Sequence, residues 1–202
     1  MTVKELAYTV QCHIQDAIGS EFKRSHAYEL LAAAYGFRTF ASIHTEWVFS
    51  GPSLCERWPS ENESNVRARC RDLGLSDVHA ESIAHSLPKY LELNQFGITK
   101  ISALYANLLQ QFPDYSADSE DYEDEDDWQE ALEDHELLLS EIAKSDLLYD
   151  EVTSAAERGV QFAREALELI RALRRAVAVQ QSNKLAEAMD KKVISGYGLL
   201  RR

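Results

Sequence analysis

Two groupings of histidine and cysteine are the first candidates for chemistry in this chain of 202 residues. Cys12 and His13 are its only adjacent thiol and imidazole, the side chains that nucleophilic catalysis uses. Both fall in a predicted helix, where consecutive side chains diverge by about 100° and cannot meet. His79 and His85 are six residues apart, which is not the i, i+4 spacing of a helical metal pair. We therefore predict no catalytic residue, no metal site and no cofactor.

Known nucleotide-binding and hydrolase motifs are also missing from the sequence. It contains no GxxxxGK[ST], no GxGxxG and no GxSxG. The three cysteines, Cys12, Cys55 and Cys70, are an odd number without a CxxC spacing, which argues against disulfides and structural zinc. The sequence thus favours a non-enzymatic protein.

The most unusual feature of the chain is an acidic segment. From Asp114 to Asp127, nine of fourteen residues are acidic and none is basic. The net charge is −2 over 1–110, −15 over 111–150 and +4 over 151–202, so the excess negative charge lies in one stretch of the chain. Concentrated charge raises encounter rates with a surface of opposite sign, and interspersed aromatic side chains can anchor such a contact. We interpret the segment as a solvated joint that also binds a partner.

We predict an interaction, regulatory or accessory protein whose partner is a protein with a basic surface. It would contact the acidic segment and the apolar seam of the last helix. The candidate contact residues are Tyr115, Tyr122, Glu123, Asp124, Glu125, Asp126, Trp128, Ile170, Leu173 and Val177. A homo-oligomer formed through the last helix is an alternative that the same seam allows.

Composition predicts an all-α fold. Only 8 Gly and 4 Pro are present, while Ala, Leu and Glu recur throughout, which favours helix over strand. No apolar run approaches the roughly 20 residues of a membrane-spanning helix, and the first residues lack the apolar core of a signal peptide. We expect a cytoplasmic protein that does not contact a membrane.

The first half should form a bundle of short helices. A capping box at Thr2 and Glu5 predicts a helix that stops at Gly19. A second helix is expected from an N-cap at Ser25 to Gly36, and a third from Thr39 through Trp47. After a loop over 48–63, further helices are expected over 66–73, after Ser76 and after an N-cap at Thr99.

The second half should contain longer helices. One is expected to begin near Trp128, and a last helix to carry one apolar seam from Val152 through Gly159 to Val177. The two would pack as a hairpin. The resulting organisation is an N-terminal domain over 1–112, an acidic linker over 113–127, a C-terminal hairpin over 128–192 and a basic tail over 193–202 that leaves the helical pattern.

The run from Lys23 to Ile43 resembles a short helical module with the pattern SHxxxLLAxxxGFxxFxxL. Such modules occur near the N-termini of uncharacterised bacterial proteins, some of them repeat-type and some glyoxalase-related. The resemblance implies a bacterial helical module and supplies no metal ligands.

The same residues also suggest a helix-turn-helix corner over 25–47, with Lys23, Arg24 and Arg38 as nucleic-acid contacts. The third helix contains Glu46 and no Lys or Arg, although phosphate contacts supply much of the affinity for DNA. We therefore keep a nucleic-acid-binding regulator as an alternative, beside an accessory protein that mimics DNA through its acidic segment, and expect no nucleic-acid partner.

Overall fold

A computed structural model describes residues 2–111 and 136–198, without the side chains of 60–61, 111, 136–137 and 185–198. The fold is mainly α-helical, as the composition predicted. Its helices are α1 (Val3–Ile18), α2 (Arg24–Ala34), α3 (Phe40–Ile43), α4 (Glu63–Asp72), α5 (Asp77–Leu93), α6 (Ile101–Gln111), α8 (Glu136–Lys144), α9 (Asp146–Glu157) and α10 (Ala163–Gly198). Two strands, β1 (Trp47–Ser50) and β2 (Gly97–Lys100), and two short 3₁₀ turns, Pro52–Leu54 and Pro59–Asn62, complete the described part.

Helix α1 matches its sequence signals closely. The Thr2 side chain accepts from the Glu5 amide, and the Glu5 carboxylate accepts from the Thr2 amide at 2.7 Å. Gly19 ends the helix in the left-handed region at φ 67°. One face, including Leu6, Val10 and Ile14, is fully buried.

Several other helices end in the same hydrogen-bonded turn. After α2, the Phe37 amide donates to Ala32 and the Gly36 amide to Ala33, with Gly36 at φ 80°. Gly74 after α4 and Gly159 after α9 adopt the same conformation, which a residue without a Cβ enters at little cost. The start of α2 was predicted wrongly, because Lys23 is its N-cap and Ser25 lies within its first turn.

The two-stranded antiparallel sheet corrects the prediction for two segments. Trp47 begins β1, so the third helix stops at Ile43, and the expected loop after it starts as a strand. Thr99 lies in β2 opposite Val48, and its hydroxyl donates to Glu56 at 3.0 Å, so it does not cap α6. Both strands have four residues, too few for an alternation pattern to show in the sequence.

The core consists of two hydrophobic clusters that meet at this sheet. The N-terminal cluster joins α1 to α5 with Phe49 and Ile98, and the C-terminal cluster joins α6, α8, α9 and α10 with Val48 and Leu54. Neighbouring residues of β1 thus face different clusters. Helix α6, which falls within the predicted N-terminal domain 1–112, packs against α10 in the C-terminal cluster. The predicted linker 113–127 lies outside the described residues.

Two polar contacts fix the sheet region to the helices around it. The Tyr35 hydroxyl donates to the Phe96 carbonyl at 2.9 Å. On the other side, the Glu141 carboxylate of α8 accepts from the Ser53 hydroxyl at 2.6 Å. Burial raises the pKa of Tyr35 far above its ordinary value, so this hydroxyl stays a donor at any physiological pH.

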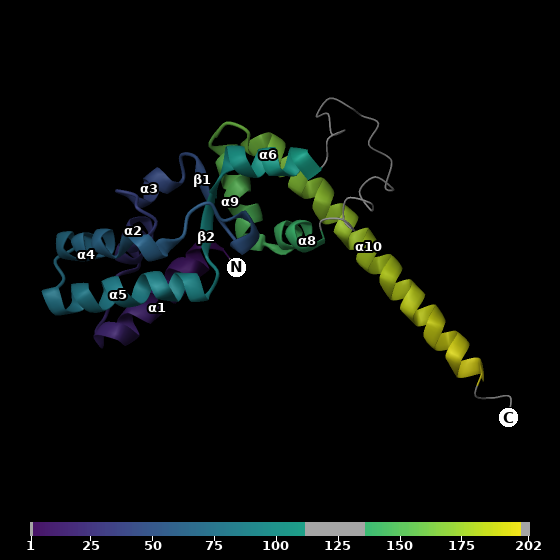
Figure 1. Ribbon diagram of the computed structural model, residues 1–202, viewed down its shortest axis with the longest axis horizontal. Helices are drawn as coiled ribbons and strands as arrows, with labels where there is room; N and C mark the ends of the chain where they lie inside the picture. The colour runs from purple at the N-terminus through teal and green to yellow at the C-terminus, as the bar shows by residue number, and fades with distance from the viewer. Residues whose placement is uncertain (1, 112–135, 199–202) are drawn as a thin grey trace.

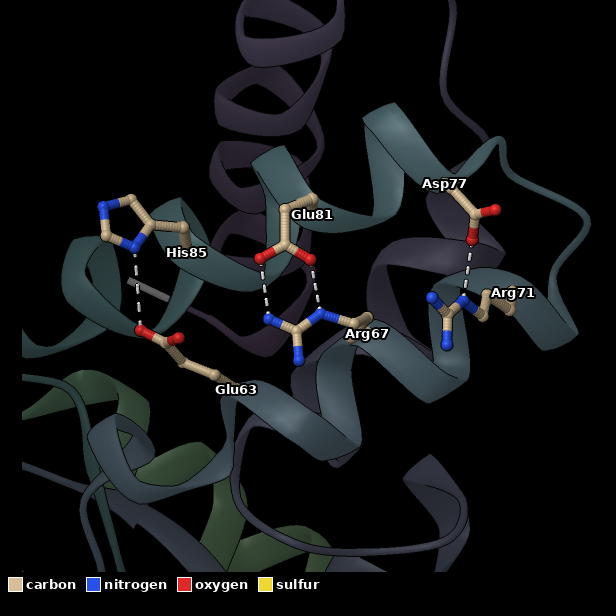
Figure 2. Close-up of polar contacts among 6 residues, drawn as sticks. All are labelled: Glu63, Arg67, Arg71, Asp77, Glu81 and His85. Atoms are coloured by element: carbon tan, nitrogen blue, oxygen red, sulfur yellow. Dashed lines mark hydrogen bonds and ion pairs between the residues drawn. The ribbon is translucent and has the colours of Figure 1, made fainter.

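Ion pairs tie α4 to α5 on the surface of the N-terminal region (Figure 2). Arg67 donates to both oxygens of Glu81 at 2.6 and 2.8 Å, and Arg71 donates to Asp77 at 2.9 Å. The bidentate bond to Arg67 lowers the pKa of Glu81. Exposed pairs contribute little to stability, so these contacts chiefly fix the register of the two helices.

The last helix differs from its prediction at both ends. The seam predicted as one helix from Val152 to Val177 is divided by the turn at Gly159 into α9 and α10. At the other end, α10 continues to Gly198, through most of the segment predicted to leave the helical pattern. Figure 1 shows its yellow C-terminal half projecting beyond all the other helices.

Candidate functional site

A cavity of about 610 Å³ lies beside the end of the sheet where Trp47 pairs with Lys100. Three connections form its walls: residues 44–46 between α3 and β1, residues 100–102 where β2 passes into α6, and residues 158–162 between α9 and α10. Its volume is within the range of roughly 300–1,000 Å³ that small-molecule sites occupy.

The backbone holds these connections together. Strand β2 continues into α6 without a loop, and the Ile101 amide donates to the Glu46 carbonyl at 2.9 Å. The Arg158 guanidinium donates to the His44 carbonyl at 3.3 Å, which joins the α9–α10 turn to the α3–β1 connection. All three walls are therefore fixed relative to one another by hydrogen bonds.

Two cations border the cavity. Arg158 extends from the end of α9 and also donates to the Ser154 hydroxyl, while the Lys100 ammonium lies 5.4 Å from the centre of the Trp47 ring. Among the side chains that the structure describes, neither cation has a carboxylate within 4.0 Å. Glu46 is the acidic residue among those that line the cavity.

A buried imidazole–carboxylate pair supports one wall. His44 Nδ1 lies 3.4 Å from Glu151 Oε2, and the Glu151 residue is only 5% exposed. Neither atom has a hydrogen-bond partner in the described part of the chain. Since a buried carboxylate requires compensation, the pair holds the His44 ring in place while His44 also lines the cavity.

An aromatic pair closes the opposite side. The Phe162 ring stacks on Tyr105 of α6, with ring centres 5.4 Å apart and planes 13° apart. Phe162 has φ 65°, a conformation that is rare for a bulky residue, yet its side chain remains 36% exposed. This residue lines the cavity, and its backbone conformation carries a cost in energy.

The partner-binding residues predicted from the sequence lie elsewhere. Ile170 and Leu173 are fully buried and Val177 is 9% exposed, all within the C-terminal cluster. The seam of the last helix is thus covered by α6, α8 and α9 of the same chain and is not open to a partner. The acidic and aromatic candidates Tyr115, Tyr122, Glu123, Asp124, Glu125, Asp126 and Trp128 lie outside the described residues.

The helix-turn-helix corner lacks a recognition helix. Helix α3 has four residues, about one turn, which is too short to place several side chains along a major groove. Lys23 and Arg24 lie at the start of α2 and Arg38 lies beyond its end, so α2, about 16 Å long, separates them. Arg24 is held by Gln11 and lies over the Tyr8 ring of α1.

Cys55, Cys70 and His13 do not form a reactive group with one another. Burial raises the pKa of Cys70 to about 12 and also raises that of Cys55, so neither is a thiolate at neutral pH. His13 is stacked on Tyr90, with ring centres 4.2 Å apart. Among the side chains described, no three His, Cys, Asp or Glu residues gather as a metal site would require.

No family model, no curated protein and no solved structure matches this chain. The described helices include none that is long and apolar enough to cross a membrane. The residues of the cavity wall were not singled out in the sequence. His44 and Glu151 lie in separate halves of the chain with no local motif around either, so only the folded chain brings them together.

Proposed function

We propose that this is a non-enzymatic cytoplasmic interaction or regulatory protein, which binds a basic protein partner through its acidic segment and the projecting part of α10. The observation that supports this most directly is the length of α10. It has 36 residues, and the buried positions among its described side chains end at Val177. The remaining backbone to Gly198 lies beyond the other elements in Figure 1.

A projecting helix of this kind favours a binding role on energetic grounds. Most helical stability in proteins comes from packing an apolar face against other elements. Residues 178–198 would gain that packing from a partner. The acidic segment, with nine carboxylates in fourteen residues, would accelerate the encounter with a basic surface.

The acidic segment is tested by charge removal. Replacing Asp121, Glu123, Asp124, Glu125 and Asp126 with Ser should slow association with a partner captured from the native host, and the loss should shrink at high salt because screening already weakens the attraction. The control replaces the same number of exposed acids elsewhere: Asp16, Glu21, Glu92, Asp150 and Glu157. Equal association rates for the two variants would contradict the proposal.

The projecting part of α10 is tested by truncation after Gln181. The shortened chain should keep the melting temperature of the full chain, because the removed residues follow the last buried position, and it should lose the partner. Sedimentation of both chains tests the alternative of a homo-oligomer formed through this helix. Capture of nucleic acid in place of a protein would instead favour the regulator alternative.

A further inference from the structure

We infer that the cavity bordered by His44, Lys100 and Arg158 is a binding site for a small phosphate-bearing molecule. This inference is independent of partner binding, because it concerns different residues. It rests on the charge, the hydrogen-bond donors and the shape of the cavity.

The charge of the cavity opposes that of the chain. The sequence carries a net charge of −13, whereas Lys100 and Arg158 with Glu46 leave one positive charge on the residues that line the cavity. The two cations come from different elements, β2 and the end of α9, and neither is neutralised by a carboxylate of the described residues. Cations that line one concave surface favour an anionic ligand.

The available donors suit a phosphate group. A guanidinium donates five N–H groups in a planar fork, and only two contacts of Arg158, to Ser154 and His44, are made within the chain. Lys100 adds a compact charge, and Ser102 adds a hydroxyl at the first turn of α6, where helix amides favour an anion. These three groups can surround a tetrahedral anion from several sides.

The other walls indicate a ligand larger than a free ion. The volume of about 610 Å³ far exceeds that of one phosphate, and Phe162 contributes an exposed aromatic surface. His44 also lines the cavity, and its Nδ1 lies 3.4 Å from Glu151 Oε2. The single net positive charge suits a phosphate monoester of modest size better than a polyanion.

Binding is best measured by titrating the full chain with phenyl phosphate while recording amide chemical shifts. Inorganic phosphate serves as the smaller probe and sodium chloride as the control for ionic strength. We expect saturable shifts in residues 100–102 and 158–162, with weaker binding of inorganic phosphate. Lys100→Gln and Arg158→Gln should each weaken binding at least tenfold, because each removes one charged donor and neither residue belongs to a hydrophobic cluster.

Arg175→Gln is the matched control, since Arg175 is exposed on α10 away from the cavity. Its affinity should equal that of the natural chain. The inference is overturned if neither probe produces saturable shifts at matched ionic strength. It is overturned equally if all three variants bind as the natural chain does, or if the shifts fall on residues outside the three connections.

Discussion

The N-terminal and C-terminal clusters are built in contrasting ways. Around the N-terminal cluster the helices are short, the longest being α5 with 17 residues, and several end in turns that return the chain to the core. Around the C-terminal cluster, α10 has 36 residues, and its described side chains are buried only as far as Val177. The N-terminal region is thus closed upon itself, whereas the C-terminal region keeps surface available for other molecules.

The cavity lies on the boundary between these regions. Its walls come from α3 and β1 on one side and from α6, α9 and α10 on the other. Because the N-terminal region is rigidly packed, it can hold one wall while the turn between α9 and α10 supplies the other. Rigid support of this kind is what a binding site requires of the elements around it.

The largest predicted effects on stability come from truncating one buried side chain in either cluster. Leu30→Ala in α2 and Leu169→Ala in α10 remove fully buried side chains, and each should lower the free energy of unfolding by about 2–5 kcal/mol. Both variants should still unfold in one cooperative step, because Val48 and Phe49 of one strand belong to different clusters. Circular dichroism and tryptophan fluorescence during urea unfolding would measure this.

Leu93→Ala is the control, because Leu93 is 83% exposed and its loss should change stability by no more than about 0.5 kcal/mol. Separate transitions for the two probes in either core variant would show that the clusters unfold independently. The sheet would then be only a connection between two domains.

The sequence predicted best what depends on neighbouring residues. The capping box at Thr2 and the helix ends at Gly19 and Gly36 are local, and each is present in the structure. Gly159 was misread because a small residue at a seam position looks the same whether it packs against a neighbour or turns the chain. One left-handed glycine therefore changed the architecture of the second half.

What depends on distant residues was not predictable. Threonine is a residue type that commonly caps a helix, so Thr99 was predicted as an N-cap. Only its pairing with the distant residue Val48 makes it part of a strand. The His44–Glu151 pair and the cations of the cavity likewise converge only after the chain has folded. The apolar seam at Ile170 and Leu173 was recognised as apolar, but the sequence could not say that its partner is the same chain.

An intermediate effect on stability is expected in the two-stranded sheet, where the two clusters meet. An added Cβ at Gly97 would overlap Cys55 Sγ and lie 2.6 Å from Cys55 Cβ, while pairing with Ser50 restrains the strand from moving away. Gly97→Ala should therefore cost about 1–3 kcal/mol of unfolding free energy, measured from urea midpoints. Cys55→Ala in the same chain should recover part of the loss, and no recovery would place the strain elsewhere.

The smallest predicted effect is on the pH dependence of the unfolding free energy, and it concerns His13 in the N-terminal region. Burial lowers the pKa of His13 below its ordinary value of 6.5, although the Ser86 backbone and Asp16 act in the opposite direction. The unfolded chain therefore binds this proton first, so the contribution of neutral His13 to stability is complete above pH 6.5 and is lost as the pH falls. His13→Phe keeps a ring against Tyr90, and its unfolding free energy should fall less between about pH 7 and pH 5.

His79→Gln provides the comparison, since His79 is a second histidine of the N-terminal region with no ring or ion-pair contact among the described residues. Its pH dependence should follow that of the natural chain. If the unfolding free energy of His13→Phe fell with decreasing pH as steeply as that of His79→Gln, the loss of stability in acid would have to come from other groups. Each variant removes one histidine from the same region, so both change the titratable charge of the chain equally. The difference between their pH dependences of unfolding free energy therefore reports the burial of His13.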